Sequence, residues 1–294
     1  MPFAEAKGAK LYYEEAGSGY PIVFVHEFGG DHRCWEQQMR YFSRHYRCVA
    51  FNARGYPPSD VPDEAALYGQ EFAADDIAAV IRHIGQPRAH VVGLSQGAFA
   101  ALHFGMRHPD LASALVLAGC GSGAPKADRE RFQRESRAKA DQLEKEGIDK
   151  LALDMALAPT RVQLQNKDPR GFAEFVQHLA EHSSLGSAMT LRNYQAARPS
   201  LYDLGPEIAA VAIPTLILVG DEDEPCLEAS LYLKRTISAS GLSVFPKTGH
   251  PMNLEEPDLF NQAVADFLAA VEIGKWLPRD PRSRAGSMFA AAGA

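Results

Sequence analysis

Short runs of consecutive hydrophobic residues alternate with longer amphipathic stretches along most of the chain. An apolar run rich in β-branched residues is typical of a strand that is buried on both faces of a sheet. The first such run, Pro21–His26, follows a stretch of alternating hydrophobic and polar residues, Lys10–Glu15, which predicts a half-buried strand. Similar runs predict further strands at Tyr46–Phe51, Ala89–Leu94, Ala114–Ala118, Pro214–Gly220 and Leu242–Phe245.

The stretches between these runs place their apolar residues at helical spacing. They predict helices over Trp35–Ser43, Gln70–Ile84, Gln96–Arg107, Glu228–Ser238 and Pro257–Val271. Because buried strands that alternate with helices require crossover connections, the pattern predicts an α/β fold with a mainly parallel sheet and helices on both faces.

The alternation stops between about residues 122 and 206, where no strand-like run occurs. Helical stretches occupy this segment instead, at Arg129–Glu146, Ile148–Leu157, Gly171–Leu185 and Ser187–Ala197. We expect them to form a cap over a pocket. The expected organisation is a core domain in two parts, residues 1–121 and 207–273, interrupted by the cap at residues 122–206. A tail at residues 274–294 is expected to be loosely ordered or to lie along a neighbouring surface.

The chain has 294 residues, of which 46% are hydrophobic and 23% are charged, as in an ordinary globular protein. Its formal net charge of −7 does not favour binding to the negatively charged backbone of a nucleic acid. No apolar run approaches the roughly 18 residues that a membrane span needs. We therefore expect a small-molecule substrate as partner rather than a nucleic acid or a membrane. We expect a monomer or a homodimer.

The four cysteines, Cys34, Cys48, Cys120 and Cys226, are far apart and lack the spacing of zinc ligands. The first residues also lack the basic start and apolar core of a signal peptide. We expect reduced, buried thiols in a cytoplasmic protein, with neither a metal ion nor a cofactor.

The strongest chemical signal is Gly93-Leu94-Ser95-Gln96-Gly97, which lies between a predicted strand and a predicted helix. A G-x-S-x-G motif at such a junction is typical of a nucleophile elbow. The serine must occupy a strained turn to present its hydroxyl at the carboxyl edge of the sheet. Small residues must flank it, because the strand and the helix approach closely there. We therefore predict that Ser95 is a nucleophile.

A serine hydroxyl needs a base to remove its proton. In proteins with this motif, an acid and then a histidine follow the serine along the chain. The strand Pro214–Gly220 runs into Asp221-Glu222-Asp223-Glu224, and the last predicted strand is followed by Thr248-Gly249-His250. Both loops follow strands and are expected at the same edge of the sheet as Ser95. The sequence therefore predicts His250 as the base and offers Asp221 and Asp223 as acids.

These motifs resemble those of the α/β-hydrolase superfamily over roughly residues 3–271. The resemblance extends to Asn52-Ala53-Arg54-Gly55-Tyr56, which is similar to the family's D-x-R-G-x-G loop. It implies an α/β-hydrolase fold with a mostly parallel eight-stranded sheet, flanking helices and a helical cap. It also implies Ser95 as nucleophile, His250 as general base and Asp223, at the fourth position of Gly-x-x-Asp, as acid. Asp221 is the alternative acid.

The loop after the third strand departs from the family pattern, because Glu27 follows His26 where the family usually has glycine. The resemblance implies that the backbone N–H groups of Phe28 and Gln96 form the oxyanion hole. We interpret Glu27 as a structural residue that pairs with a cation such as Arg54. The alternative is that Glu27 and His26 contribute to substrate binding.

The resemblance implies a serine hydrolase that cleaves a small, mostly apolar ester, lactone or related acyl compound through an acyl-enzyme. The same triad serves hydrolases of C–C bonds, so the sequence leaves the type of bond open. Two other classes remain as alternatives. One is a non-hydrolytic enzyme on this scaffold, such as a hydroxynitrile lyase or a cofactor-free oxygenase, and the other is a ligand-binding receptor with slow turnover.

Overall fold

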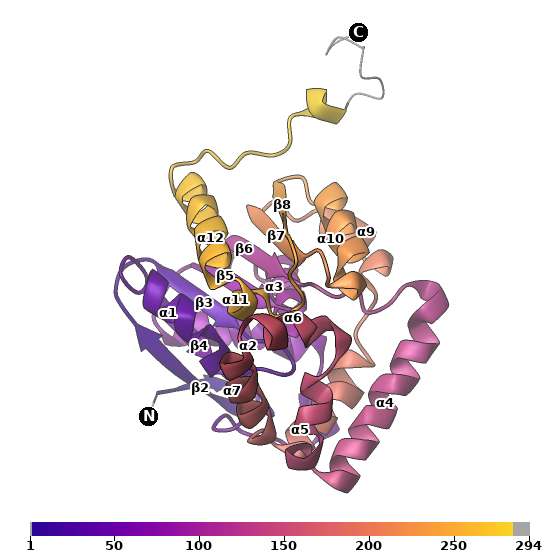
Figure 1. The fold of residues 1–294 in the computed structure, drawn as a ribbon. Coiled ribbons are helices and arrows are strands. Elements are labelled where there is room, and N and C mark those ends of the chain that lie inside the picture. Colours follow the sequence, from indigo (N-terminus) through magenta and orange to yellow (C-terminus); the bar gives the residue numbers. More distant parts are fainter. Residues whose placement is uncertain (1, 285–294) are drawn as a thin grey trace.

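The computed structural model describes residues 2–284 and contains an eight-stranded sheet (Figure 1). The strand order is β1-β2-β4-β3-β5-β6-β7-β8. β2 pairs antiparallel with β1 and β4, and the remaining pairings are parallel, so the predicted mostly parallel sheet is confirmed. The strands are β1 (Phe3–Ala6), β2 (Ala9–Ala16), β3 (Pro21–Val25), β4 (Arg47–Phe51), β5 (Ala89–Leu94), β6 (Ala112–Ala118), β7 (Thr215–Gly220) and β8 (Ser240–Phe245).

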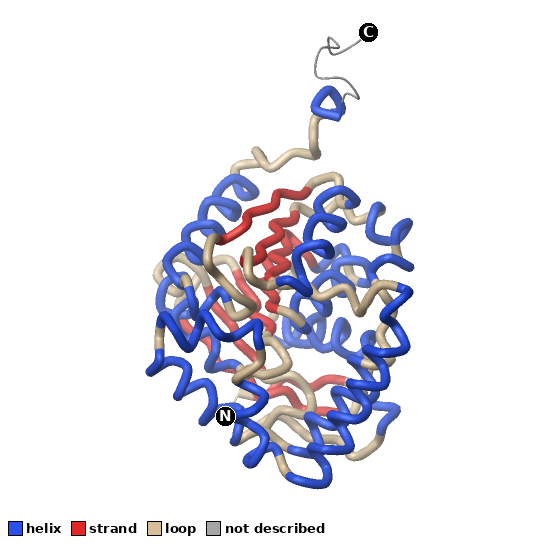
Figure 2. The backbone as a smooth tube through the Cα atoms, turned by 45° about the vertical axis from the view of Figure 1, so that its right-hand side comes forward, coloured by secondary structure: helices blue, strands red, loops and turns tan. Residues whose placement is uncertain are grey.

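Helices cover both faces of the sheet, which explains why its central strands are apolar on both sides (Figure 2). Along β3, Ile22 and Phe24 pack in one buried cluster, whereas Val23 and Val25 pack in the other. The first cluster includes residues of α1 (Glu36–Phe42), α11 (Met252–Glu255) and α12 (Pro257–Glu272). The second includes residues of α2 (Gln70–His83), α3 (Gln96–Arg107) and α10 (Glu224–Thr236). The five helices predicted outside the cap segment are therefore confirmed, although α10 begins earlier than expected.

The segment between β6 and β7 is helical, as predicted, and most of its helices lie together on one side of the molecule (Figure 1). They share a buried cluster that includes Leu143, Leu151 and Phe175. Ile208, by contrast, packs in the core cluster of the sheet, so the predicted boundary at residue 206 falls inside a helix that joins the core. The elements are η4 (Lys126–Asp128), α4 (Arg129–Glu146), α5 (Ile148–Ala156), η5 (Pro159–Arg161), α6 (Val162–Lys167), α7 (Pro169–Ala180), α8 (Ser184–Met189), the π-helix η6 (Thr190–Gln195), η7 (Leu201–Asp203) and α9 (Gly205–Ala209).

The beginning of the tail contacts the core. Trp276 packs against Phe267, and its Nε1 donates a hydrogen bond to the carbonyl of Ala239 at 2.9 Å. A short helix, η8 (Pro281–Arg284), follows, and the predicted tail residues 285–294 lie outside the described residues.

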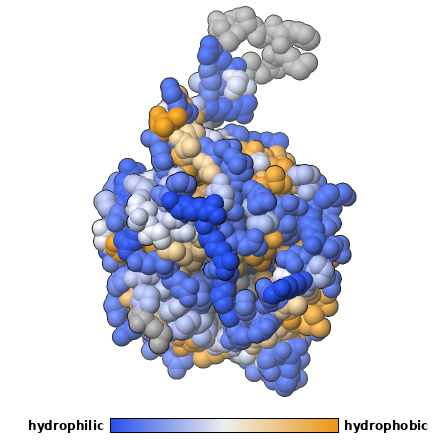
Figure 3. All heavy atoms as spheres, turned by 60° about the vertical axis from the view of Figure 1, so that its left-hand side comes forward, coloured by the Kyte–Doolittle hydropathy of each residue, from blue (hydrophilic) through white to orange (hydrophobic). Residues whose placement is uncertain are grey.

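Hydrophobic residues on the face shown in Figure 3 form separate patches among hydrophilic ones. Among residues 2–284, no helix combines the length and the apolar character that crossing a bilayer would require.

Candidate active site

Ser95 occupies the sharp turn between β5 and α3, as the motif predicts. Its φ of 56° is rare for a residue with a side chain, and its N–H donates a hydrogen bond to the carbonyl of Ala118 at 2.8 Å. The two flanking positions must be glycine, because no side chain fits there. A Cβ on Gly97 would lie 2.1 Å from the carbonyl oxygen of Val25, and a Cβ on Gly93 would lie 2.3 Å from the carbonyl oxygen of Gly97. The sequence around Ser95 therefore builds a strained and tightly packed elbow.

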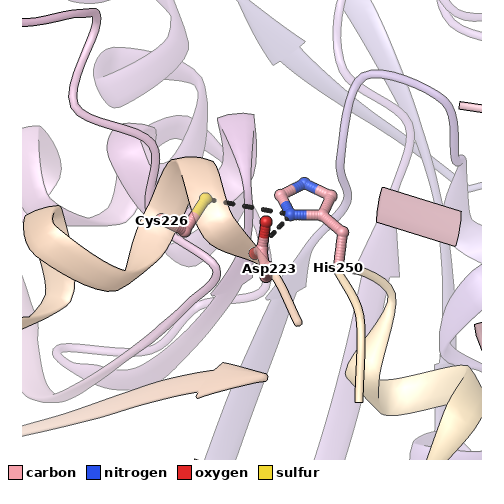
Figure 4. Close-up of side chains that lie close together, drawn as sticks. All are labelled: Asp223, Cys226 and His250. Carbon is pink, nitrogen blue, oxygen red and sulfur yellow. Dashed lines mark hydrogen bonds and ion pairs between the residues drawn. The ribbon is translucent and has the colours of Figure 1, made fainter. Parts of the chain in front are cut away.

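Asp223 and His250 form a close pair at the same edge of the sheet. The Asp223 Oδ2 lies 2.7 Å from His250 Nδ1 (Figure 4), and Asp223 is fully buried. Because a carboxylate only accepts, the imidazole proton lies on Nδ1, and Nε2 has no hydrogen-bond partner among residues 2–284. Burial alone would lower the pKa of His250, but the charge and the hydrogen bond of Asp223 raise it above its ordinary value.

Of the two candidate acids, the structure brings only Asp223 to His250. Asp221 is exposed, and its Oδ1 accepts a hydrogen bond from the N–H of Thr248 at 3.1 Å. Asp221 thus supports the loop that carries His250 without contacting the imidazole.

Gly119 links the elbow to the Asp223–His250 pair. It follows Ala118, the hydrogen-bond partner of Ser95, and its φ is +54°. A Cβ on Gly119 would lie 3.2 Å from His250 Nδ1 and 3.3 Å from Asp223 Oδ2. The end of β6 therefore lies against both the elbow and the pair. The parallel strands β5, β7 and β8 end at one edge of the sheet, where Ser95, Asp223 and His250 follow them.

Cys226 lies beside the pair, on the first turn of α10 (Figure 4). Its Sγ lies 3.9 Å from His250 Nδ1 and donates to the carbonyl of Gly119 at 3.3 Å. Potential ligand atoms of Asp223, Cys226 and His250 lie within 4.8 Å of one another, close enough for the three to be considered as ligands of one metal ion. Burial holds the pKa of the Cys226 thiol well above its usual range, so the sulfur stays protonated and is a poor ligand and nucleophile.

The two predicted oxyanion donors are available. Neither the N–H of Phe28 nor that of Gln96 has an acceptor within the described part of the chain. The carbonyl of Phe28 accepts a hydrogen bond from the Tyr56 hydroxyl at 3.0 Å. The Gln96 side chain is held by Gln195, whose Nε2 donates to Gln96 Oε1 at 2.7 Å. Both backbone donors therefore belong to residues that are fixed before a substrate arrives.

His26 holds the oxyanion loop by its backbone. Its Nδ1 donates to the carbonyl of Glu27 at 2.7 Å, and its Nε2 accepts from the N–H of Ala53 at 3.0 Å. Burial lowers the pKa of His26 to about 4, so the ring is neutral at neutral pH. With both nitrogens occupied and only 1% of the residue exposed, His26 is placed to position the loop rather than to bind substrate.

Glu27 is buried and forms an ion pair with Arg161 of η5, not with Arg54 as expected. Arg54 instead pairs with Asp76 of α2, at 2.6 Å. The Arg161 guanidinium also lies over the Phe175 ring, 5.3 Å from its centroid. The expected pairing of Glu27 with a cation is therefore present, but the cation comes from the cap.

The cap contacts the His250 loop as well. The carbonyl of Thr160, next to Arg161, accepts a hydrogen bond from the N–H of His250 at 2.8 Å. Glu255 also holds this loop, because its Oε2 accepts a hydrogen bond from the N–H of Gly249 at 2.6 Å, and burial raises the pKa of Glu255 to about 7. The segment η5 thus touches both the oxyanion loop and the loop of the predicted base. No sequence motif indicated this contact.

Comparison with known proteins places this architecture in a family. Residues 20–257 match the family described as alpha/beta hydrolase fold. The AB hydrolase superfamily protein YisY of Bacillus subtilis is 30% identical, over 87% of this chain and 94% of that protein. The 3-oxoadipate enol-lactonase 1 of Acinetobacter baylyi is 23% identical, over 85% of this chain and 89% of that protein. A thermophilic esterase from Thermogutta terrifontis, solved with malate bound, has a TM-score of 0.81 and 26% identity over 91% of this chain and 97% of its own. This chain therefore belongs to the alpha/beta hydrolase fold family, and its relatives include hydrolases.

Proposed function

We propose that this protein is a serine hydrolase that cleaves a small, mostly apolar ester, lactone or related acyl substrate. The observation that carries the proposal is the 2.7 Å contact of His250 Nδ1 with Asp223, which leaves Nε2 as a proton acceptor at the edge of the sheet where the Ser95 elbow lies. The relatives named as an enol-lactonase and an esterase support acyl chemistry.

In the proposed reaction, Ser95 Oγ attacks the carbonyl carbon of the substrate while His250 Nε2 takes the hydroxyl proton. Asp223 stabilises the imidazolium that forms. The N–H groups of Phe28 and Gln96 stabilise the oxyanion. His250 then gives its proton to the leaving group, and the acyl-enzyme remains. A water molecule, deprotonated by His250, attacks this ester. The bond to Ser95 Oγ then breaks, His250 returns the proton to that oxygen, and the acid leaves.

We propose that the helices between residues 122 and 206 cap the site and contribute to specificity. Arg161 and Thr160 support this role, because they bring the cap into contact with the two loops that carry Phe28 and His250.

A fluorophosphonate probe and p-nitrophenyl acetate test the proposal together. We expect stoichiometric labelling of Ser95, identified by peptide mass spectrometry, and a burst of p-nitrophenol equal to the enzyme concentration. Labelling without turnover of any ester, lactone or diketone would instead favour a lyase, an oxygenase or a receptor. Absence of labelling in folded protein would contradict the nucleophile itself.

Replacing Glu27 with glutamine is expected to lower the free energy of unfolding by about 3 kcal/mol, because it leaves the Arg161 cation without its buried partner. We expect kcat to stay within about tenfold of the wild-type value, since the proposed oxyanion donor of this loop is the backbone N–H of Phe28 and not the Glu27 side chain. Denaturant unfolding and ester turnover, measured on the same preparations, check the two parts.

Glu36 provides the matched control, because it forms an exposed ion pair with Arg40. Glu36→Gln should change stability by less than about 1 kcal/mol. Adding Arg161→Met to Glu27→Gln should recover part of the lost stability, since no buried charge is then left alone. A 100-fold loss of kcat/KM in Glu27→Gln, with stability unchanged, would show that Glu27 acts on the substrate.

A further inference from the structure

Arg198 is a buried cation that has no hydrogen-bond or ion-pair partner for its side chain among residues 2–284. It follows the π-helix η6, where the chain returns from the cap, and only 6% of the residue is exposed. Its guanidinium makes no hydrogen bond or ion pair with any residue in the described range 2–284, and its Nε is fully buried. Arg54, which is similarly buried at 4% exposure, instead has Asp76 and two backbone carbonyls as partners. Arg198 therefore differs from an ordinary structural arginine of this protein.

The surroundings of Arg198 hold the guanidinium in place but do not neutralise it. The guanidinium lies 4.2 Å from the centroid of the Phe99 ring and 5.9 Å from that of Phe132. Such cation–π contacts stabilise a charge, yet they leave all five N–H donors of the group free. Because a planar guanidinium presents these donors as a fork, it is suited to bind a carboxylate through two parallel hydrogen bonds.

The titratable groups near Arg198 supply no negative charge at neutral pH. Burial raises the pKa of Cys120 to about 12 and raises those of Tyr194 and Cys226 above their usual range. Burial lowers the pKa of His103 to about 4, with a further lowering from the Arg198 charge. All four groups are therefore neutral. A buried charge without a counter-ion lowers the stability of the fold. A bound anionic ligand would neutralise the Arg198 charge and explain why the residue is present.

The guanidinium lies close to the predicted catalytic pair. A Cβ on Gly121 would lie 3.4 Å from Arg198 Nη2, and a Cβ on Gly119, two residues earlier, would lie 3.2 Å from His250 Nδ1. The α-carbons of these glycines are at most about 7.6 Å apart. The two Nη atoms have no partner in the described part of the chain but, unlike Nε, are not fully buried. A carboxylate bound at these Nη atoms would thus be separated from the Asp223–His250 pair by the length of a short acyl chain.

We propose that Arg198 binds a carboxylate of the substrate, so that the preferred substrates are esters or lactones whose acyl part ends in a carboxylate. The inference rests on the proposed hydrolase function and specifies its substrate class. The acyl chain lies on apolar surface, the carboxylate forms a forked ion pair with Arg198, and the ester carbonyl reaches Ser95.

Matched esters test the inference. Monomethyl succinate and monomethyl glutarate carry the carboxylate, and methyl butyrate and methyl valerate replace it with a methyl group. We expect the wild-type protein to have a kcat/KM at least about tenfold higher for the carboxylates, as a charged hydrogen bond provides. Arg198→Met should remove this preference and leave the neutral esters within about threefold. Arg198→Lys should retain part of it, because the charge remains without the fork.

Arg131, an exposed cap residue paired with Asp128, gives the control for overall charge. Arg131→Met should leave the preference unchanged. Arg198→Met should also raise the melting temperature, because methionine fills the site between the rings without an unpaired charge. Equal losses on both ester series, with a lowered melting temperature, would show a purely structural arginine and overturn the inference.

Binding of glutarate to the Ser95→Ala protein, measured by calorimetry, separates this inference from the hydrolase proposal. We expect a dissociation constant in about the millimolar range or below, and loss of binding when Arg198→Met is added. Binding that depends on Arg198, in a protein that cleaves no ester, would retain the carboxylate site and refute the hydrolase. Cleavage of neutral esters without glutarate binding would refute the carboxylate site alone.

Discussion

Replacing Ser95 with alanine is expected to lower kcat by about 10⁶-fold, the loss seen when a comparable serine nucleophile is removed. Without Oγ there is no acyl-enzyme, and His250 has no hydroxyl proton to remove. Stability should change little, because the Ser95 side chain makes no capping hydrogen bond and alanine adopts the same positive φ at similar strain. Steady-state turnover, together with unfolding by denaturant, measures both parts.

Ser243, a half-buried serine on β8, serves as the control serine because it lies outside the proposed site. Ser243→Ala should keep full activity. If Ser95→Ala retained a tenth of the wild-type turnover while remaining folded, Ser95 could not be the nucleophile. The proposal of an acyl-enzyme on Ser95 would then be wrong.

Much of the fold could be predicted because buried strands and amphipathic helices leave local patterns. Helix α4 occupies the predicted range Arg129–Glu146, and β5 occupies Ala89–Leu94. Other elements lack such a pattern. β1 has only four residues and is an edge strand, so few of its side chains need to be apolar. The predicted helix at Glu228 in fact starts at Glu224, because Pro225 fits the first turn of a helix.

The edge of the sheet at which the site lies could be predicted for a similar reason. Strand ends fix which loops meet, so Ser95, Asp223 and His250 could be expected at one edge. Contacts that depend on tertiary packing could not. The partner of Glu27 is 134 residues away, in a cap whose docking no local pattern encodes. The isolation of Arg198 was equally hidden, because an absent partner leaves no signal in a sequence.

Replacing Asp223 with asparagine is expected to lower kcat by about 10⁴-fold. The amide can donate a hydrogen bond to Nδ1, which places the imidazole proton on Nε2, where the base must accept. Asp221→Asn is the control, since the Asp221 carboxylate accepts a hydrogen bond from the N–H of Thr248 at 3.1 Å and makes none to His250. Its kcat should stay within about tenfold of wild type. A larger loss in Asp221→Asn than in Asp223→Asn would identify Asp221 as the acid.

The pH dependence of kcat/KM gives an independent test of the same pair. The reaction needs neutral His250, so activity should fall as the pH drops through its pKa, which Asp223 raises above the ordinary value. In Asp223→Asn the stabilising charge is gone and the effect of burial remains, so the pKa of His250 falls. The acidic limb of the pH profile, where activity is lost on acidification, should therefore shift to lower pH for the residual activity. Glu255, whose pKa is about 7, is the other group whose titration could produce the acidic limb. Glu255→Gln should leave the limb in place. If that variant removes the limb and Asp223→Asn does not move it, the limb belongs to Glu255 and the imidazole is not held by Asp223 during the reaction.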